Sequence, residues 1–198
     1  MSISDGGNMK ETEKIFGTKQ IAATAILLAI CIASQFFKNL SIFITGPIIN
    51  ACIVLAVMTV NLPCALLLCL ITPVTAYFIA ASPVMMAVPG ILPFIMLGNA
   101  VLAVAARFLI RPALKQKGKI FSSRSVIMGV LSAALKGIVM GLTISLWLLP
   151  TFIPAESPLY AKLGTFQLTF GLFQFITALI GVVYAYILLV PLRKTAGY

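Results

Sequence analysis

The chain has 198 residues, of which 61% are hydrophobic and only 9% are charged. Soluble domains carry about 25% charged residues, so this composition indicates one integral membrane domain without an attached soluble domain. The formal net charge is +10, but the basic residues cluster in short loops and at the chain ends. Membrane topology signals are distributed in this way, which argues against nucleic acid as a partner.

Six apolar segments are long enough to cross a bilayer, which takes about 20 apolar residues in a helix. We expect transmembrane helices at residues 18–37, 43–60, 63–80, 90–110, 125–150 and 164–190. The longer connections are expected to be loops at residues 81–89, 111–124 and 151–163. The predicted fold class is an all-α integral membrane protein with six transmembrane helices. A transmembrane domain at 18–192 lies between cytoplasmic tails at 1–17 and 193–198, and the first tail lacks the layout of a signal peptide.

The basic residues predict how this domain is oriented. An even number of spans places both termini on one side of the membrane. Ten basic residues belong to that side: Lys10, Lys14, Lys19, Arg111, Lys115, Lys117, Lys119, Arg124, Arg193 and Lys194. The other side has only Lys38 and Lys162. Basic loops face the cytoplasm, so we predict a multi-pass protein of the cell membrane with both termini cytoplasmic.

Lys136 is the most informative residue, because it lies in the middle of the fifth apolar segment. A charge at that depth costs about 2.5–3.5 kcal/mol on insertion scales. No Asp or Glu occurs in any apolar segment, so a carboxylate of this chain cannot pair with it there. Hydroxyls, amides, backbone carbonyls, water or a bound anion remain as partners. We therefore predict a cavity that reaches Lys136 from the outer side and admits an anionic or carboxylate-bearing solute.

Asn99 falls near mid-depth with Lys136, and other polar and aromatic residues fall in the outer half of the predicted bundle. A ligand site combines apolar walls with a few placed polar groups. The candidate substrate-binding residues are Lys136, Asn99, Asn50, Gln174, Trp147, Phe170 and Gln35. In this hypothesis Lys136 is the anchor, the amides orient the solute, and Trp147 and Phe170 form a stacking wall. The alternative is that each amide only hydrogen-bonds a neighbouring helix.

Catalytic chemistry finds little support in the sequence. There is no His and no carboxylate pair within the spans, so we expect no metal, no cofactor and no acid–base catalysis. The four cysteines lie in apolar segments without CxxC spacing and are interpreted as core residues. Ser132 precedes Lys136 by one helical turn, which leaves a Ser–Lys nucleophile as a weak alternative.

Ala25 and Ala29 lie four residues apart in the first apolar segment, and small residues at this spacing allow a second helix to approach closely. That helix belongs either to this chain or to a partner protein. The chain resembles the S components of energy-coupling factor (ECF) transporters. The features that carry the resemblance are these alanines, the six spans, the segment GPIIN-ACIVLAV, the short NLP link and LPFIMLGNAVL. The resemblance covers about residues 18–192.

This resemblance implies a function and a set of partners. An S component binds a vitamin or another micronutrient at the outer side and has no ATPase activity of its own. Ala25 and Ala29 would dock onto a membrane coupling protein, which connects to two cytoplasmic ATPase subunits. We therefore expect a substrate-binding subunit of an importer rather than an enzyme. A stand-alone small-solute permease and a Ser132–Lys136 membrane enzyme are the alternatives.

Overall fold

In the computed structural model, residues 16–37, 41–117 and 120–196 are described, and throughout these residues the regular structure is helical. Six helices are long and apolar enough to cross a membrane, which confirms the six predicted spans. Of the predicted tail at 1–17, only Phe16 and Gly17 are among the described residues. Lys38 also lies outside the described residues.

The first three spans are close to their predicted bounds. They comprise α1 (Thr18–Gln35), α2 (Ile42–Leu55) with the π-helical η1 (Ala56–Val60), and α3 (Leu62–Ala80). The Asn61 side chain caps α3 by accepting a hydrogen bond from the Cys64 N–H at 2.8 Å. Because this link is so short, α2 and α3 run antiparallel.

The connection between the third and fourth spans is not a plain loop. Residues Pro83–Ala87 form the short helix α4, in which Val84 and Met85 are buried. The fourth span consists of α5 (Ile91–Ala105) and the π-helical η2 (Ala106–Ile110), and it continues into α6 (Arg111–Lys117). The prediction of a loop from residue 111 is therefore wrong at its start.

The last two spans contain interruptions that the sequence pattern did not predict. The fifth is α7 (Ser123–Met140), the π-helical η3 (Gly141–Leu148) and α8 (Leu149–Phe152). After the 3₁₀ turn η4 (Tyr160–Lys162), the sixth span is α9 (Leu163–Phe170) and α10 (Leu172–Ala196). Gly171 separates these two helices, with φ −103° and ψ −94°, so the predicted continuous helix over 164–190 is wrong at this residue.

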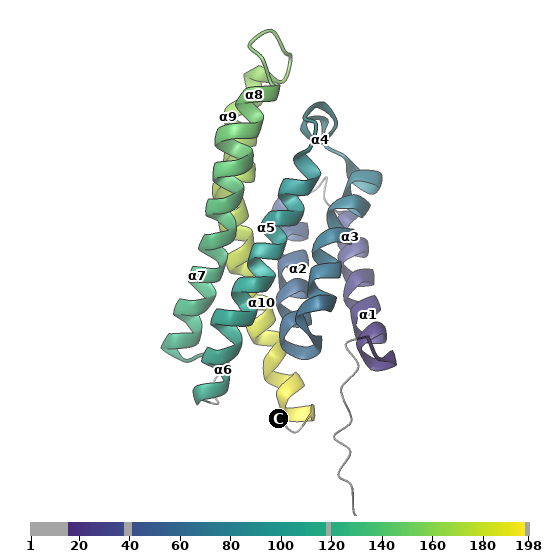
Figure 1. Ribbon diagram of the computed structural model, residues 1–198, viewed down its shortest axis with the longest axis vertical. Helices are drawn as coiled ribbons and strands as arrows, with labels where there is room; N and C mark the ends of the chain where they lie inside the picture. Colours follow the sequence, from purple (N-terminus) through teal and green to yellow (C-terminus); the bar gives the residue numbers. More distant parts are fainter. Residues whose placement is uncertain (1–15, 38–40, 118–119, 197–198) are drawn as a thin grey trace, which may run out of the picture.

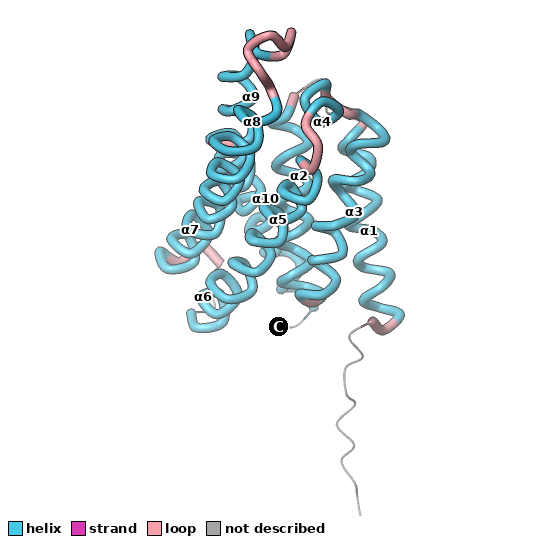
Figure 2. Tube along the Cα trace, turned by 45° about the horizontal axis from the view of Figure 1, so that its top comes forward, coloured by secondary structure: helices cyan, strands magenta, loops and turns pink. Residues whose placement is uncertain are grey.

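The helices form a bundle around α2, which packs against α10, α1, α5 and α3 (Figure 1). The start of α1, α6 and the end of α10 lie at one end of the bundle, shown at the bottom of Figure 1. The short helix α4 and the α8–α9 hairpin lie at the opposite end, where the longer loops are also found (Figure 2). We call these the terminal end and the α4 end.

Candidate functional site: a lysine held by two asparagines

The buried apolar residues form two separate clusters along the bundle. One contains Ile53, Leu68, Leu102, Ala133 and Ala178, and it fills the terminal half. The other contains Val84, Ile91, Met140 and Phe170 and lies toward the α4 end.

Buried polar residues lie between these two clusters. In α7, for example, Lys136 falls between Ala133 of the first cluster and Met140 of the second. Each of the six spans contributes at least one such residue: Gln35, Asn50, Thr72, Asn99, Lys136 and Thr177. Buried polar groups are costly inside a membrane bundle unless they are paired, so this polar level is the candidate functional site.

Lys136 is at the centre of this polar level and only 3% exposed. Its Nζ donates to Asn50 Oδ1 at 2.6 Å and to Asn99 Oδ1 at 2.7 Å. The hydrogen bonds join α7 to α2 and α5, so three spans meet at one ammonium group. Neutral oxygens supply all its described contacts. Among the described residues the one acidic side chain is Glu156, in the loop after α8.

A cavity of about 320 Å³ lies against these residues. It is lined by all three members of the Lys136 site and by side chains of α4 and α9, so it extends from the polar level toward the α4 end. The other lining residues include Thr45, Ile49, Thr72, Val84, Met85, Ile95, Phe166, Phe170 and Gln174. This volume is at the lower end of the range for small-molecule sites, which is about 300–1,000 Å³.

Five of the seven residues predicted to bind substrate line this cavity: Asn50, Asn99, Lys136, Phe170 and Gln174. Their role in binding remains a prediction. The lining residues that sequence reasoning missed include four threonines and the α4 pair Val84 and Met85. Thr72 and Thr169 gave no signal, because a hydroxyl that bonds its own helix is common in membrane spans. Thr45 instead donates to the Ser34 carbonyl oxygen of α1. The signal for α4 was the Met-rich composition of residues 81–89.

The other two predicted residues lie elsewhere. Trp147 is 56% exposed on η3 and packs edge-to-face against Phe94, with ring centroids 5.6 Å apart. It is not a wall of this cavity. Gln35 is fully buried behind the cavity wall, where its Nε2 donates to the Thr72 carbonyl oxygen at 3.0 Å. Its Oε1 has no partner, the single such buried side-chain atom within the described chain.

The Ser132–Lys136 pair lacks the geometry of a nucleophile and its base. Ser132 Oγ donates to the Met128 carbonyl oxygen of its own helix at 2.7 Å. The Lys136 ammonium is hydrogen-bonded to the two asparagines instead. A nucleophile of this type needs its base within hydrogen-bond reach, and the described contacts direct both groups elsewhere.

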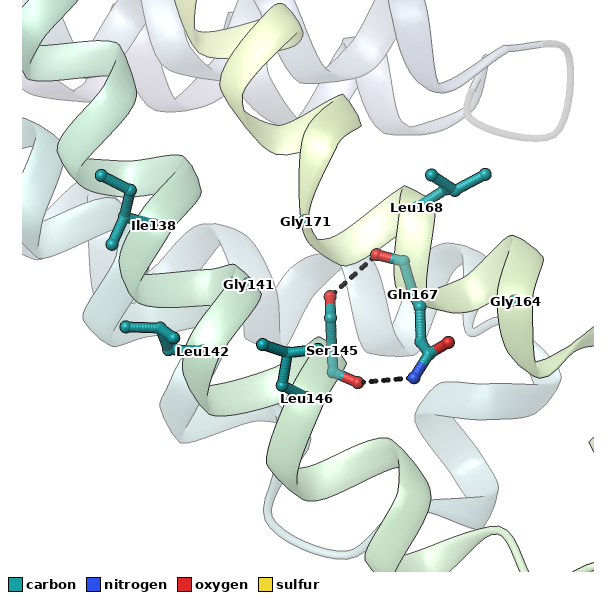
Figure 3. Close-up of a pocket in the computed structure, with 9 residues that line it drawn as sticks. All are labelled: Ile138, Gly141, Leu142, Ser145, Leu146, Gly164, Gln167, Leu168 and Gly171. Atoms are coloured by element: carbon teal, nitrogen blue, oxygen red, sulfur yellow. Dashed lines mark hydrogen bonds between the residues drawn. The ribbon is translucent and has the colours of Figure 1, made fainter.

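A second hollow, of about 430 Å³, lies between η3 and α9 (Figure 3). Its rim is apolar and exposed at Leu142, Leu146 and Leu168. The polar groups inside it are paired with each other. Ser145 Oγ donates to the Gln167 carbonyl oxygen at 2.8 Å, and Gln167 Nε2 donates to the Ser145 carbonyl oxygen at 3.1 Å. These two bonds fasten α9 to η3, and no charged side chain lines this hollow.

The alanines of α1 face away from the bundle. Ala25 and Ala29 are exposed, and so are Ile26 and Ile30 beside them. The sequence left open whether this face packs against another helix of the same chain or against a partner protein. Within the described residues it does not pack against another helix of the chain. The face is open to lipid or to another protein.

Six long apolar helices around a buried polar level make this a multi-pass membrane protein with a solute-sized cavity. In comparisons with known proteins, the chain matches no family model, no curated protein and no solved structure.

Proposed function

We propose that the chain is the substrate-binding S component of an ECF-type importer, which captures a small water-soluble micronutrient for uptake driven by partner ATPases. The observation that carries this proposal is Lys136: a cation in the middle of the bundle, held by neutral amides, at the end of a cavity. A purely structural lysine would be an expensive way to join three helices. A residue that binds solute explains why the charge is retained.

The arrangement of the two apolar clusters supports capture rather than free passage. The terminal half of the bundle is filled by large buried side chains such as Ile53, Leu68 and Leu102. A solute that reached Lys136 would stop against this cluster. A subunit that captures a solute and depends on partners for release needs such a closed half, whereas a channel needs a continuous path.

The charges support an orientation with the terminal end in the cytoplasm of a cell membrane. Among described residues, this end carries Lys19, Arg111, Lys115, Arg124 and Arg193. The α4 end has Lys162 together with Glu156. Positive loops stay on the cytoplasmic side, so the cavity would extend toward the outside.

Purification of the tagged full-length chain from membranes of its native host tests the proposal. We expect three further proteins to accompany it, a membrane coupling protein and two ATPases. We also expect mass spectrometry of the washed sample to detect a small molecule that Lys136→Ala loses. Uptake of that molecule into liposomes by the purified chain alone would instead establish the stand-alone permease.

A further inference from the structure

We propose that the group bound at the floor of the cavity is a single carboxylate, and that the solute enters with this carboxylate toward Lys136. The inference rests on the proposed capture function and adds the chemistry and the orientation of the solute. The floor of the cavity is formed by Lys136, Asn50 and Asn99. The inference follows from how these three residues share their hydrogen-bond donors and acceptors.

The Lys136 ammonium fixes the orientation of both asparagine amides. An ammonium group can only donate, so the atom of each amide that faces Nζ must be the oxygen. Asn50 and Asn99 both present Oδ1 to Nζ, at 2.6 and 2.7 Å. Their NH₂ groups are therefore left for other partners. A flipped amide would place donors against a cation, and the neighbouring charge prevents this.

Most of the hydrogen-bonding capacity left over at the floor consists of donors, although each Oδ1 keeps a second lone pair beside the cation. Nζ has three N–H bonds and uses two, and each amide keeps both of its own. Neither Nδ2 atom makes a hydrogen bond to the described chain. Both asparagines line the cavity, and neither Nδ2 atom is a fully buried atom without a hydrogen-bond partner. Both Nδ2 atoms are therefore open to the cavity. A floor of this kind fits a group that only accepts hydrogen bonds through more than one oxygen.

The polar groups on the walls differ from those at the floor. The hydroxyls of Thr45, Thr72 and Thr169 donate to the carbonyl oxygens of Ser34, Leu68 and Thr165. Gln174 Nε2 donates to the Thr169 carbonyl oxygen at 3.3 Å, which leaves Oε1 as an acceptor. Besides these groups the walls are mostly apolar, with the Ser82 and Thr165 hydroxyls and one further Gln174 N–H, so they suit the body of the solute and its neutral polar groups. An anionic group placed at the walls would be separated from Lys136, the one ionisable cation that lines the cavity.

Charge balance restricts the anion to one negative charge. Lys136 is the single ionisable cation lining the cavity, and a second negative charge would be buried without a partner. A phosphate monoester near pH 7 carries about 1.5–2 negative charges and fits less well. A carboxylate carries one, with two acceptor oxygens. The volume of about 320 Å³ is at the lower end of the range for small-molecule sites, so the whole solute is small.

Matched probes in lipid nanodiscs test this inference on the full-length chain. The probes are benzoate, benzamide, benzylamine and phenyl phosphate, together with hexanoate and hexanamide, and affinity is taken from the dependence of the unfolding temperature on probe concentration. We expect at least one acid to bind, with its amide, amine or phosphate counterpart at least tenfold weaker. Equal or tighter binding of a counterpart, or no binding of either acid, overturns the carboxylate assignment.

Asn50→Asp provides the matched variant, because it replaces two donors by an acceptor and neutralises Lys136 with little change in shape. We expect it to fold, since the new carboxylate still accepts from Nζ, and to weaken binding of the acid at least tenfold. Asn61→Asp makes the same chemical change at the cap of α3, outside the cavity, and should bind like the wild type. Unchanged acid binding by Asn50→Asp overturns the inference. The capture function fails separately, if the protein purified from its host retains no small molecule of any class.

Discussion

Gly181 of α10 lies directly behind Asn50 of α2. A β-carbon built on Gly181 would come 2.5 Å from Asn50 Cβ, 2.8 Å from the Pro47 carbonyl oxygen and 3.0 Å from the Ala51 nitrogen. Two of these three atoms belong to backbone, which cannot rotate away. The absence of a side chain on α10 thus allows α2 to come close enough for Asn50 to reach Lys136.

We therefore expect Gly181→Ala to push α2 away from α10. Overpacking of this kind costs about 1–3 kcal/mol, while Ala in place of Gly in a helix returns about 0.5–1 kcal/mol. The net effect should be a lower free energy of unfolding and a weaker Asn50–Lys136 contact. Thermal unfolding in nanodiscs measures the first effect, and binding of the retained small molecule measures the second.

Gly164→Ala is the matched control, because a β-carbon at Gly164 meets no atom within 4 Å. It should be neutral or slightly stabilising. Equal behaviour of the two variants would show that the close approach at Gly181 has no influence on the site.

The Lys136 site also predicts an asymmetry between its members. Asn50→Leu removes one of two acceptors from a buried ammonium, and losing a hydrogen bond to a charged group costs about 1.5–3 kcal/mol. Lys136→Met removes the charge itself and leaves two amides that each carry a donor and an acceptor, so they can bond each other or water. We expect Asn50→Leu to lower the unfolding temperature much more than Lys136→Met.

The double variant Asn50→Leu, Lys136→Met completes the cycle and isolates the pairwise term. It should unfold at a higher temperature than Asn50→Leu alone, because the unpaired charge is gone. If the two single effects simply add, the ammonium–amide contact does not contribute to stability and Lys136 is solvated in another way.

The sequence was sufficient for the six spans and for the depth of the polar residues. Hydropathy over about 20 residues does not depend on tertiary packing, so the spans could be predicted from the sequence alone. Sequence also placed Asn99 and Lys136 near mid-depth and Asn50 in the outer half of its span. That they join at one atom depends on which helices are neighbours, and no periodicity within a single segment contains that information.

The misplacement of Trp147 has a local cause. An α-helix running on from Lys136 would carry Trp147 near the same face, since eleven residues make close to three turns. The structure is π-helical from Gly141 to Leu148, where each turn takes more residues. Trp147 is thereby rotated toward the outside and against Phe94. Nothing in the residue pattern marked this change, just as the pattern did not mark the break at Gly171.

The two hydrogen bonds between Ser145 and Gln167 hold α9, and with it Phe166 and Phe170 of the cavity wall, against η3. Ser145→Ala removes the shorter bond, in which the Ser145 hydroxyl donates across the groove. We expect faster amide hydrogen exchange in residues 163–170, by about fivefold if the bond contributes about 1 kcal/mol. Exchange is measured by mass spectrometry on the protein in nanodiscs.

Thr143→Ala serves as the control, because the Thr143 hydroxyl bonds only the Val139 carbonyl oxygen of its own span. It should leave exchange in residues 163–170 unchanged. Comparable acceleration in both variants would mean that loss of any hydroxyl in this span loosens α9, and that the Ser145–Gln167 pair has no special part in holding the hairpin.

The exposed alanines of α1 give the last prediction, which depends on the proposed S-component function. Ala25 and Ala29 leave a shallow, smooth face beside Ile26 and Ile30, and close helix packing needs small residues at such positions. Ala25→Leu or Ala29→Leu would hold a partner helix away, so the amount of coupling protein that co-purifies should fall severalfold. Binding of the retained small molecule should stay as in the wild type, because neither residue lines the cavity. Val183→Leu, on the exposed face of α10, enlarges another membrane-facing side chain and should leave assembly unchanged. Normal assembly of both alanine variants would exclude this face as the docking surface while leaving the solute site untouched.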